Sequence, residues 1–96
     1  MFVKVDEIVR CESDNNYTCF YFRSGERILV SRTLKDYEEL LEPLGFFRIH
    51  KSSLINLRYL KKYKKGEGGM VTLEDGTQLE VSRRRKEDFL KILNKQ

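Results

Sequence analysis

The most informative segment of the sequence is Phe46-Phe47-Arg48-Ile49-His50-Lys51-Ser52-Ser53-Leu54-Ile55-Asn56. It opens with two aromatic residues and ends near the apolar pair Leu54-Ile55, and both parts favour burial. Arg48, His50 and Ser52 alternate with Ile49, which is typical of a strand with one solvated face. The segment therefore begins as a strand and presents a polar, cationic surface that includes the only histidine of the chain.

The charge of the chain is distributed unevenly. Residues 46–66 contain no acidic residue but seven lysine and arginine residues. Residues 1–45 carry a net charge of −3, from six basic and nine acidic residues, whereas residues 46–96 carry +7, from thirteen and six. This asymmetry indicates a surface that binds an anion such as phosphate. A solvated face that keeps the protein soluble is the alternative.

Length and composition limit the class of protein. Ninety-six residues, 40% hydrophobic and 35% charged, predict one globular domain over residues 1–96. No apolar run approaches the ~20 residues of a membrane span, and no signal peptide is present, so we expect a cytoplasmic protein without a membrane partner. Cys11 and Cys19 can face each other across a hairpin. Since cytosolic thiols stay reduced, we expect no structural disulfide.

The first part of the chain predicts an antiparallel meander. Strands are expected over residues 8–12, 17–22 and 27–31, with turns at 13–16 and 24–25. The first turn offers two asparagine amides and a tyrosine hydroxyl. A short edge strand near the N-terminus is also considered, on Phe2, Val3 and Val5.

A helix is expected to follow the meander. Thr33 and Asp36 have the spacing of an N-terminal capping pair, and Pro43 with Gly45 predicts the end of the helix. An apolar stripe at helical spacing is expected to pack on the sheet, and it comprises Leu34, Tyr37, Leu40, Leu41 and Leu44.

The second part predicts further strands and a last helix. A strand over residues 57–63 leads into a flexible turn at 64–69, and a hairpin joins 70–73 to 78–81 about Asp75-Gly76. Ser82 is the expected N-cap of the last helix, whose apolar residues are Phe89, Ile92 and Leu93.

The last helix begins with four cations, Arg83-Arg84-Arg85-Lys86. Cations here face the positive end of the helix dipole, which is unfavourable by roughly 0.3–1 kcal/mol each. An anionic ligand at this helix start would explain the cluster, because free amides and guanidinium groups can both bind it. Projection of these side chains into solvent is the alternative.

The sequence gives no pattern for catalysis or for metal and cofactor binding. One histidine and two cysteines lack the spacing of a metal site, and His50-Ser52 lacks a nearby acid and a nucleophile elbow. No phosphate-binding glycine motif is present, since Gly66-Glu67-Gly68-Gly69 is too short. We therefore expect no enzyme, no metal and no cofactor.

Residues 46–56 resemble the signature F-x-R-I-H-[RK]-S-x-[LV]-[VI]-N of the LytTR DNA-binding domains. The similarity continues outside the signature. Ile8-Val9-Arg10-Cys11-Glu12 with Tyr17 is similar to the opening strand pair of the family, Thr33-Leu34 with Leu40-Leu41 to its short helix, and Val81-Ser82-Arg83 to its terminal element. The resemblance covers nearly the whole chain, in order.

The resemblance implies a mainly β fold with one or two helices, in an elongated arrangement of small antiparallel sheets. It implies that loops enter the major groove of double-stranded DNA for transcriptional regulation. Such domains usually follow the receiver domain of a two-component response regulator. A receiver does not fit in this chain, so an excised domain and a stand-alone protein both stay open. We expect the domains to bind DNA in pairs.

The resemblance also assigns site residues, which agree with the loops selected by charge and turn patterns. Contacts to bases are expected from Asn16, Tyr17, Lys51, Arg83 and Arg84. Contacts to phosphates are indicated by charge and by proximity to these loops rather than by the resemblance, and they are expected from Asn15, Arg48, Ser52, Lys61, Lys62 and Arg85. His50 and Asn56 are expected to support the central loop. For Tyr17, a ring buried in the sheet is the alternative.

Two other functions are consistent with the sequence. A module that binds RNA or single strands would stack bases on Tyr17, Phe20, Tyr21 or Phe22. A basic protein-interaction module would instead dock an acidic partner and would retard no DNA at physiological salt.

Overall fold

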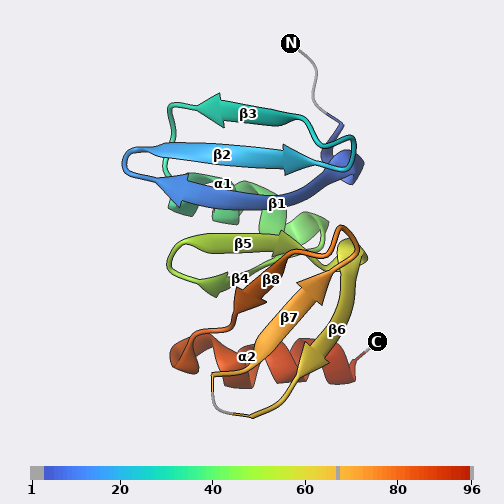
Figure 1. The fold of residues 1–96 in the computed structure, drawn as a ribbon. Helices are drawn as coiled ribbons and strands as arrows, with labels where there is room; N and C mark the ends of the chain where they lie inside the picture. Colours follow the sequence, from blue (N-terminus) through green and yellow to red (C-terminus); the bar gives the residue numbers. More distant parts are fainter. Residues whose placement is uncertain (1–3, 67, 96) are drawn as a thin grey trace.

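Two antiparallel sheets and two helices form the protein in a computed structural model that describes residues 4–66 and 68–95 (Figure 1). The strands and helices follow one another as β1 (Ile8–Asp14), β2 (Tyr17–Phe22), β3 (Arg27–Val30), α1 (Leu34–Leu41), β4 (Phe46–His50), β5 (Ser53–Asn56), β6 (Leu60–Lys64), β7 (Met70–Leu73), β8 (Gln78–Glu80) and α2 (Arg83–Asn94). Short 3-10 helices lie at Val5–Glu7, Glu42–Leu44 and Leu57–Tyr59. The extents of 39 × 24 × 22 Å confirm the elongated, mainly β fold with two helices.

The larger sheet has five strands in the order β3-β2-β1-β5-β4. The two asparagines between β1 and β2 make the predicted turn, and Asn15 takes a positive φ of 57°, which asparagine tolerates better than most residues. Strand β1 pairs with β5, so that Glu12 lies opposite Ser53. This pairing brings the turns at two distant places in the sequence to the same end of the sheet.

Helix α1 begins at the predicted cap, where the Asp36 amide donates to Thr33 Oγ1 over 3.4 Å. Leu34 and Leu41 are buried, but Leu40 and Leu44 are 58% and 60% exposed, so the predicted stripe is wrong at these two positions. At about 100° per residue, Leu40 points roughly 120° away from Leu34. Leu44 lies in the 3-10 segment, whose winding differs from that of the helix.

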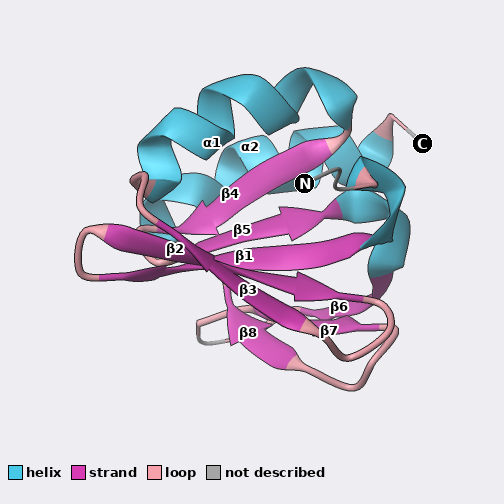
Figure 2. Cartoon of the chain, turned by 90° about the horizontal axis from the view of Figure 1, so that it is seen from above, coloured by secondary structure: helices cyan, strands magenta, loops and turns pink. Residues whose placement is uncertain are grey.

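The smaller sheet has the order β6-β7-β8 and packs with α2 against the larger one. The Phe47 and Phe89 rings lie 5.7 Å apart and join β4 to α2. Seen from above, α1 lies on one face of the five-stranded sheet and β6–β8 on the other (Figure 2). One set of buried side chains therefore lies under α1, including Cys11 and Leu54, and a second lies under the smaller sheet, including Ile55 and Val71.

Two predicted strands differ in the structure. Residues 57–59, expected in a strand, form a 3-10 helix, because the Asn56 side chain accepts from the Arg58 amide over 3.0 Å and caps it. Val5, considered for an edge strand, begins a 3-10 helix instead. Phe2 and Val3 lie outside the described residues, as does Glu67 of the turn at 64–69.

Both cysteines are free, as expected for reduced thiols. Cys11 is fully buried beneath α1. Burial raises the pKa of the Cys11 thiol from 9.0 to about 12; Cys19 adds to the rise and Arg10 opposes it.

Candidate nucleic-acid interface

Three loops meet along one side of the molecule, at the left of Figure 1. They are the β1–β2 turn at residues 15–16, the β4–β5 turn at 51–52 and the first turn of α2 from residue 83; we call this side the loop edge. The Ser13 amide donates to the Ser52 carbonyl over 3.0 Å, which joins the first two loops. The Ser82 amide donates to the Ile49 carbonyl over 2.7 Å, which holds the start of α2 beside β4.

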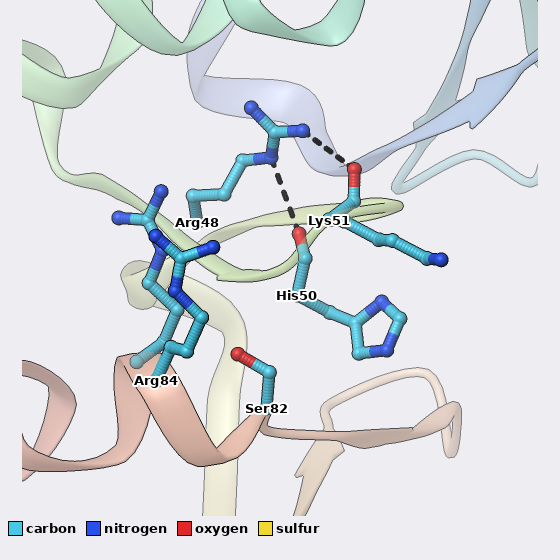
Figure 3. A pocket seen from close by; sticks show the side chains of 6 residues that line it. Arg48, His50, Lys51, Ser82 and Arg84 are labelled. Atoms are coloured by element: carbon cyan, nitrogen blue, oxygen red, sulfur yellow. Dashed lines mark hydrogen bonds between the residues drawn. The ribbon is translucent and has the colours of Figure 1, made fainter.

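The β4–β5 turn and the start of α2 enclose a cavity of about 320 Å³ (Figure 3). The residues that line it are Arg48, His50, Lys51, Ser82, Arg84 and Arg85. A neighbouring cavity of about 290 Å³ is lined in part by His50, Arg83 and Lys86. A cationic hollow at a helix start is suited to a phosphate or to the edge of a base.

The Ser82 side chain leaves the helix start open. Ser82 is the N-cap of α2 as predicted, but its hydroxyl makes no capping hydrogen bond. The first amides of a helix have no partner within it. The Arg85 amide donates to the Ser82 carbonyl over 3.1 Å, so the amides of Arg83 and Arg84 are those left to an anion that enters the cavity.

Arg48 lies beneath the β4–β5 turn rather than on the loop edge. Its Nε donates to the His50 carbonyl over 3.2 Å and its Nη2 to the Lys51 carbonyl over 2.5 Å (Figure 3). Its Nη1 donates to Glu38 Oε1 over 2.9 Å. Each of its three donor nitrogens thus has a partner within the protein, which favours a structural role over the predicted phosphate contact.

His50 and Asn56 are also engaged within the fold. His50 Nδ1 accepts from the Ser52 amide over 3.2 Å and lies 3.0 Å from Ser52 Oγ, so the ring braces the turn. Asn56 is buried, and its side-chain Nδ2 donates to the Ile8 carbonyl over 2.9 Å, between β5 and the start of β1. These contacts favour the supporting role expected for both residues.

The predicted base contacts lie on the loop edge. Tyr17 is 47% exposed, so its ring is not buried in the sheet. Lys51, Arg83 and Arg84 are exposed. Within residues 4–66 and 68–95, no carboxylate lies within 4.0 Å of these three cations, whereas Arg85 pairs with Glu38 at 3.6 Å.

Lys61 and Lys62 are not brought to the loop edge. Both are exposed, and they are the second and third residues of β6, an edge strand of the smaller sheet. The start of β6 lies on the side of the molecule opposite the three loops (Figure 1). The predicted phosphate contacts of these two lysines are therefore separated from the rest of the site.

Two residues of the site were not assigned a role from the sequence. Lys86 was predicted only as one of the four cations of the helix start; it lies one helical turn after Arg83 and lines the neighbouring cavity. Glu38 pairs with two arginines of the site, and nothing in the sequence around it points there.

Other kinds of site find little support among residues 4–66 and 68–95. No group of three or more histidine, cysteine, aspartate or glutamate residues in this part of the chain is arranged to hold a metal ion. Neither helix of the described residues is long and apolar enough to cross a membrane.

The fold and the loop edge are those of an elongated, mainly β module with a cationic interface. The family model described as the LytTr DNA-binding domain matches residues 1–94. The chain belongs to this family, so it is a LytTR DNA-binding domain.

The chain is also similar in sequence to two transcriptional regulators. The chain is 30% identical over 94 residues to the heme-containing CO-sensing transcriptional regulator RcoM 2 of Paraburkholderia xenovorans, covering 95% of this chain and 35% of the relative. It is 28% identical over 89 residues to the transcriptional regulatory protein LytR of Staphylococcus aureus, covering 91% of this chain and 36% of the relative. The chain thus spans about a third of the length of these relatives.

A solved structure has the same fold. It is the LytTr DNA-binding domain of a methyl-accepting/DNA response regulator from Bacillus cereus, with a TM-score of 0.85 and 20% identity. The match covers 95% of this chain and 84% of that one.

Proposed function

We propose that this domain binds double-stranded DNA sequence-specifically, with the loop edge in the major groove, to regulate transcription in the cytoplasm. The observation that carries the proposal is the convergence of three loops, far apart in the sequence, on one edge. Lys51 and Arg84 line one cavity there, and no carboxylate of the described residues lies within 4.0 Å of either cation. The relatives named as transcriptional regulators agree with this role.

The geometry of the hydrogen-bond donors separates the residues that contact bases from those that contact phosphates. Arg83 and Arg84 can each place two donors on the O6 and N7 atoms of a guanine, which makes them the best base readers. Asn16, Tyr17 and Lys51 complete the base-contacting set. Phosphate contacts are assigned to Asn15, Ser52 and Lys86. Arg85, also expected to contact phosphate, is paired with Glu38 at 3.6 Å.

Binding to single strands is the weaker alternative, because the aromatic platform it needs is taken up by the fold. Phe20 is 7% exposed. The Arg10 guanidinium lies 3.7 Å from the centre of the Tyr21 ring and covers it. Of the four aromatics of β2, only Tyr17 is an exposed large residue. One exposed ring is a poor stacking surface for successive bases.

The proposal extends to the complete protein. The chain covers about a third of the length of its relatives, and we infer that a receiver domain joined to it would make a response regulator of the two-component type. Two domains are then expected to occupy two half-sites on one duplex, because regulators commonly bind in pairs.

Binding-site selection from a random duplex library tests the proposal. We expect two similar short half-sites whose centres lie about one helical turn, ~10–10.5 bp, apart. Gel retardation with competing single-stranded DNA and RNA of the selected sequence should leave the duplex complex intact. Enrichment of no sequence, or preferential displacement by single strands, would contradict duplex recognition, whereas a single unpaired site would contradict only the pairing.

A further inference from the structure

Glu38 is a carboxylate at the back of a cationic site. It lies on α1, and its side chain is 16% exposed. Oε1 accepts from Arg48 Nη1 over 2.9 Å and Oε2 lies 3.6 Å from Arg85 Nη2. One carboxylate therefore joins two guanidinium groups, one from β4 and one from the first turn of α2.

The contact with Arg48 extends to the β4–β5 turn. With Nη1 held by Glu38, the planar guanidinium directs its Nε to the His50 carbonyl and its Nη2 to the Lys51 carbonyl. The orientation of Arg48 thus sets the path of the backbone that carries Lys51. The Lys51 side chain itself is exposed on the loop edge.

The contact with Arg85 extends to the start of α2. Arg85 follows Arg84 directly, and both line the cavity that Lys51 shares. Glu38 therefore links the two loops whose cations are assigned to base contacts. Their relative position determines whether Lys51 and Arg84 can reach neighbouring base pairs together.

The negative charge of Glu38 lowers affinity for DNA, although its position between the two arginines orders the site. A carboxylate within one Debye length, ~8–10 Å, of bound phosphates repels any duplex. It also occupies Arg85, which is 39% exposed and would otherwise be available to a phosphate. Attraction to DNA alone would favour a neutral residue here.

We propose that Glu38 is a positioning residue that lowers affinity for all DNA and raises discrimination between sequences. This role rests on the proposed function of the loop edge. Glu38 orders the arginines behind the edge, so that fewer arrangements of Lys51 and Arg84 are available to mismatched sites.

The test is Glu38→Gln, which keeps an oxygen acceptor for Arg48 and removes the charge. Affinities for the selected duplex and for its single-base variants are measured at several salt concentrations. We expect tighter binding to non-preferred duplex, with a salt slope steeper by about 0.9 as Arg85 neutralises one more phosphate. Discrimination at one or more base pairs should fall about tenfold, within the range attributed to a good base contact.

Glu39→Gln is the matched control. Glu39 is an exposed neighbour on the same helix, and the substitution removes the same charge. Among the described residues it has no cation within 4.0 Å. The Glu39→Gln variant should discriminate between sequences as well as the unchanged domain does.

Glu38→Asp separates position from charge, because the shorter side chain keeps the charge but cannot span both arginines. We expect it to lose discrimination, with a smaller gain in affinity for non-preferred duplex than Glu38→Gln shows, because the negative charge remains. Thermal unfolding of each variant identifies any loss of folded protein, which would reduce all affinities in the same proportion.

The outcomes divide cleanly. Equal gains on all duplexes in Glu38→Gln would mean that the carboxylate only repels DNA, and proportional losses would mean that it only stabilises the fold; either result overturns the positioning role. If Glu38→Gln discriminates between sequences as well as the unchanged domain does, only the role of Glu38 is contradicted. An unchanged domain that retards no duplex contradicts the proposed function as well.

Discussion

Replacing Arg48 by lysine should destabilise the protein by about 2–4 kcal/mol. The Arg48 side chain is 15% exposed and donates to Glu38 and to the His50 and Lys51 carbonyls. A lysine ammonium cannot reach all three partners from one rotamer, so we expect two of the contacts to be lost. Hydrogen bonds that involve a charged group contribute roughly 1.5–3 kcal/mol each, and solvent near the exposed turn reduces this sum.

The assay is urea and thermal unfolding followed by circular dichroism. A loss of 2–4 kcal/mol corresponds to a fall in Tm of roughly 10–25 °C in a domain of this size. Arg58→Lys is the matched control, since Arg58 is 63% exposed in its side chain and lies 3.9 Å from Asp6. We expect that change to stay within about 0.5 kcal/mol.

The stability measurement also separates two roles for Arg48. If Arg48→Lys unfolds like the unchanged protein but binds DNA more weakly, Arg48 contacts phosphate as the sequence predicted. A loss of about 2–4 kcal/mol in the free energy of unfolding would instead place Arg48 behind the interface, in a structural role. A stable variant would therefore refute the account of the β4–β5 turn.

Three further predictions concern pH, salt and base reading. Burial raises the pKa of the Cys11 thiol from 9.0 to about 12, so above pH 9 the thiol ionises in the unfolded chain before it does so in the folded protein. Between pH 9 and 12 this group should therefore lower the free energy of unfolding by about 1.4 kcal/mol per pH unit. Alkaline denaturation of Cys11→Ala should lack that component. If about five cationic side chains contact phosphates, log K against log salt should have a slope of roughly −4 to −5, and a slope near zero would remove the electrostatic argument. Arg84→Lys should weaken binding to the preferred duplex by about 1–3 kcal/mol and relax discrimination at one base pair, because an ammonium cannot fork onto a guanine edge; a uniform loss over all single-base variants would assign Arg84 to phosphate contact.

Most of the fold could be predicted from local sequence. Hairpin turns at Asn15-Asn16 and Asp75-Gly76 carry residues that accept positive φ, and the capping residue Thr33 begins α1 at its predicted position. The errors arise where local pattern and tertiary contact compete. Leu40 has helical spacing with part of the stripe but lies outside the face that reaches the sheet.

The candidate site was predictable only in part. Charge, turn patterns and family resemblance indicated the loops that carry Lys51 and Arg84, and the structure brings those loops together. The role of Arg48 was not predictable, because Glu38 lies ten residues away on a different element. Lys61 and Lys62 were grouped with the site by their charge alone, and β6 carries them to the other side of the molecule.

We expect DNA to bind at the loop edge rather than to positive charge in general. Lys51→Ala and Lys62→Ala test it as a pair, since both remove one exposed lysine and differ in the side of the molecule that they change. The measurement is a fluorescence anisotropy titration of each variant against the selected duplex at physiological salt. We expect Lys51→Ala to lose about tenfold or more in affinity. Lys62→Ala should lose less than about threefold, because a distant charge is screened by salt. Equal losses, or a larger loss for Lys62→Ala, would contradict the assignment of the loop edge as the DNA interface.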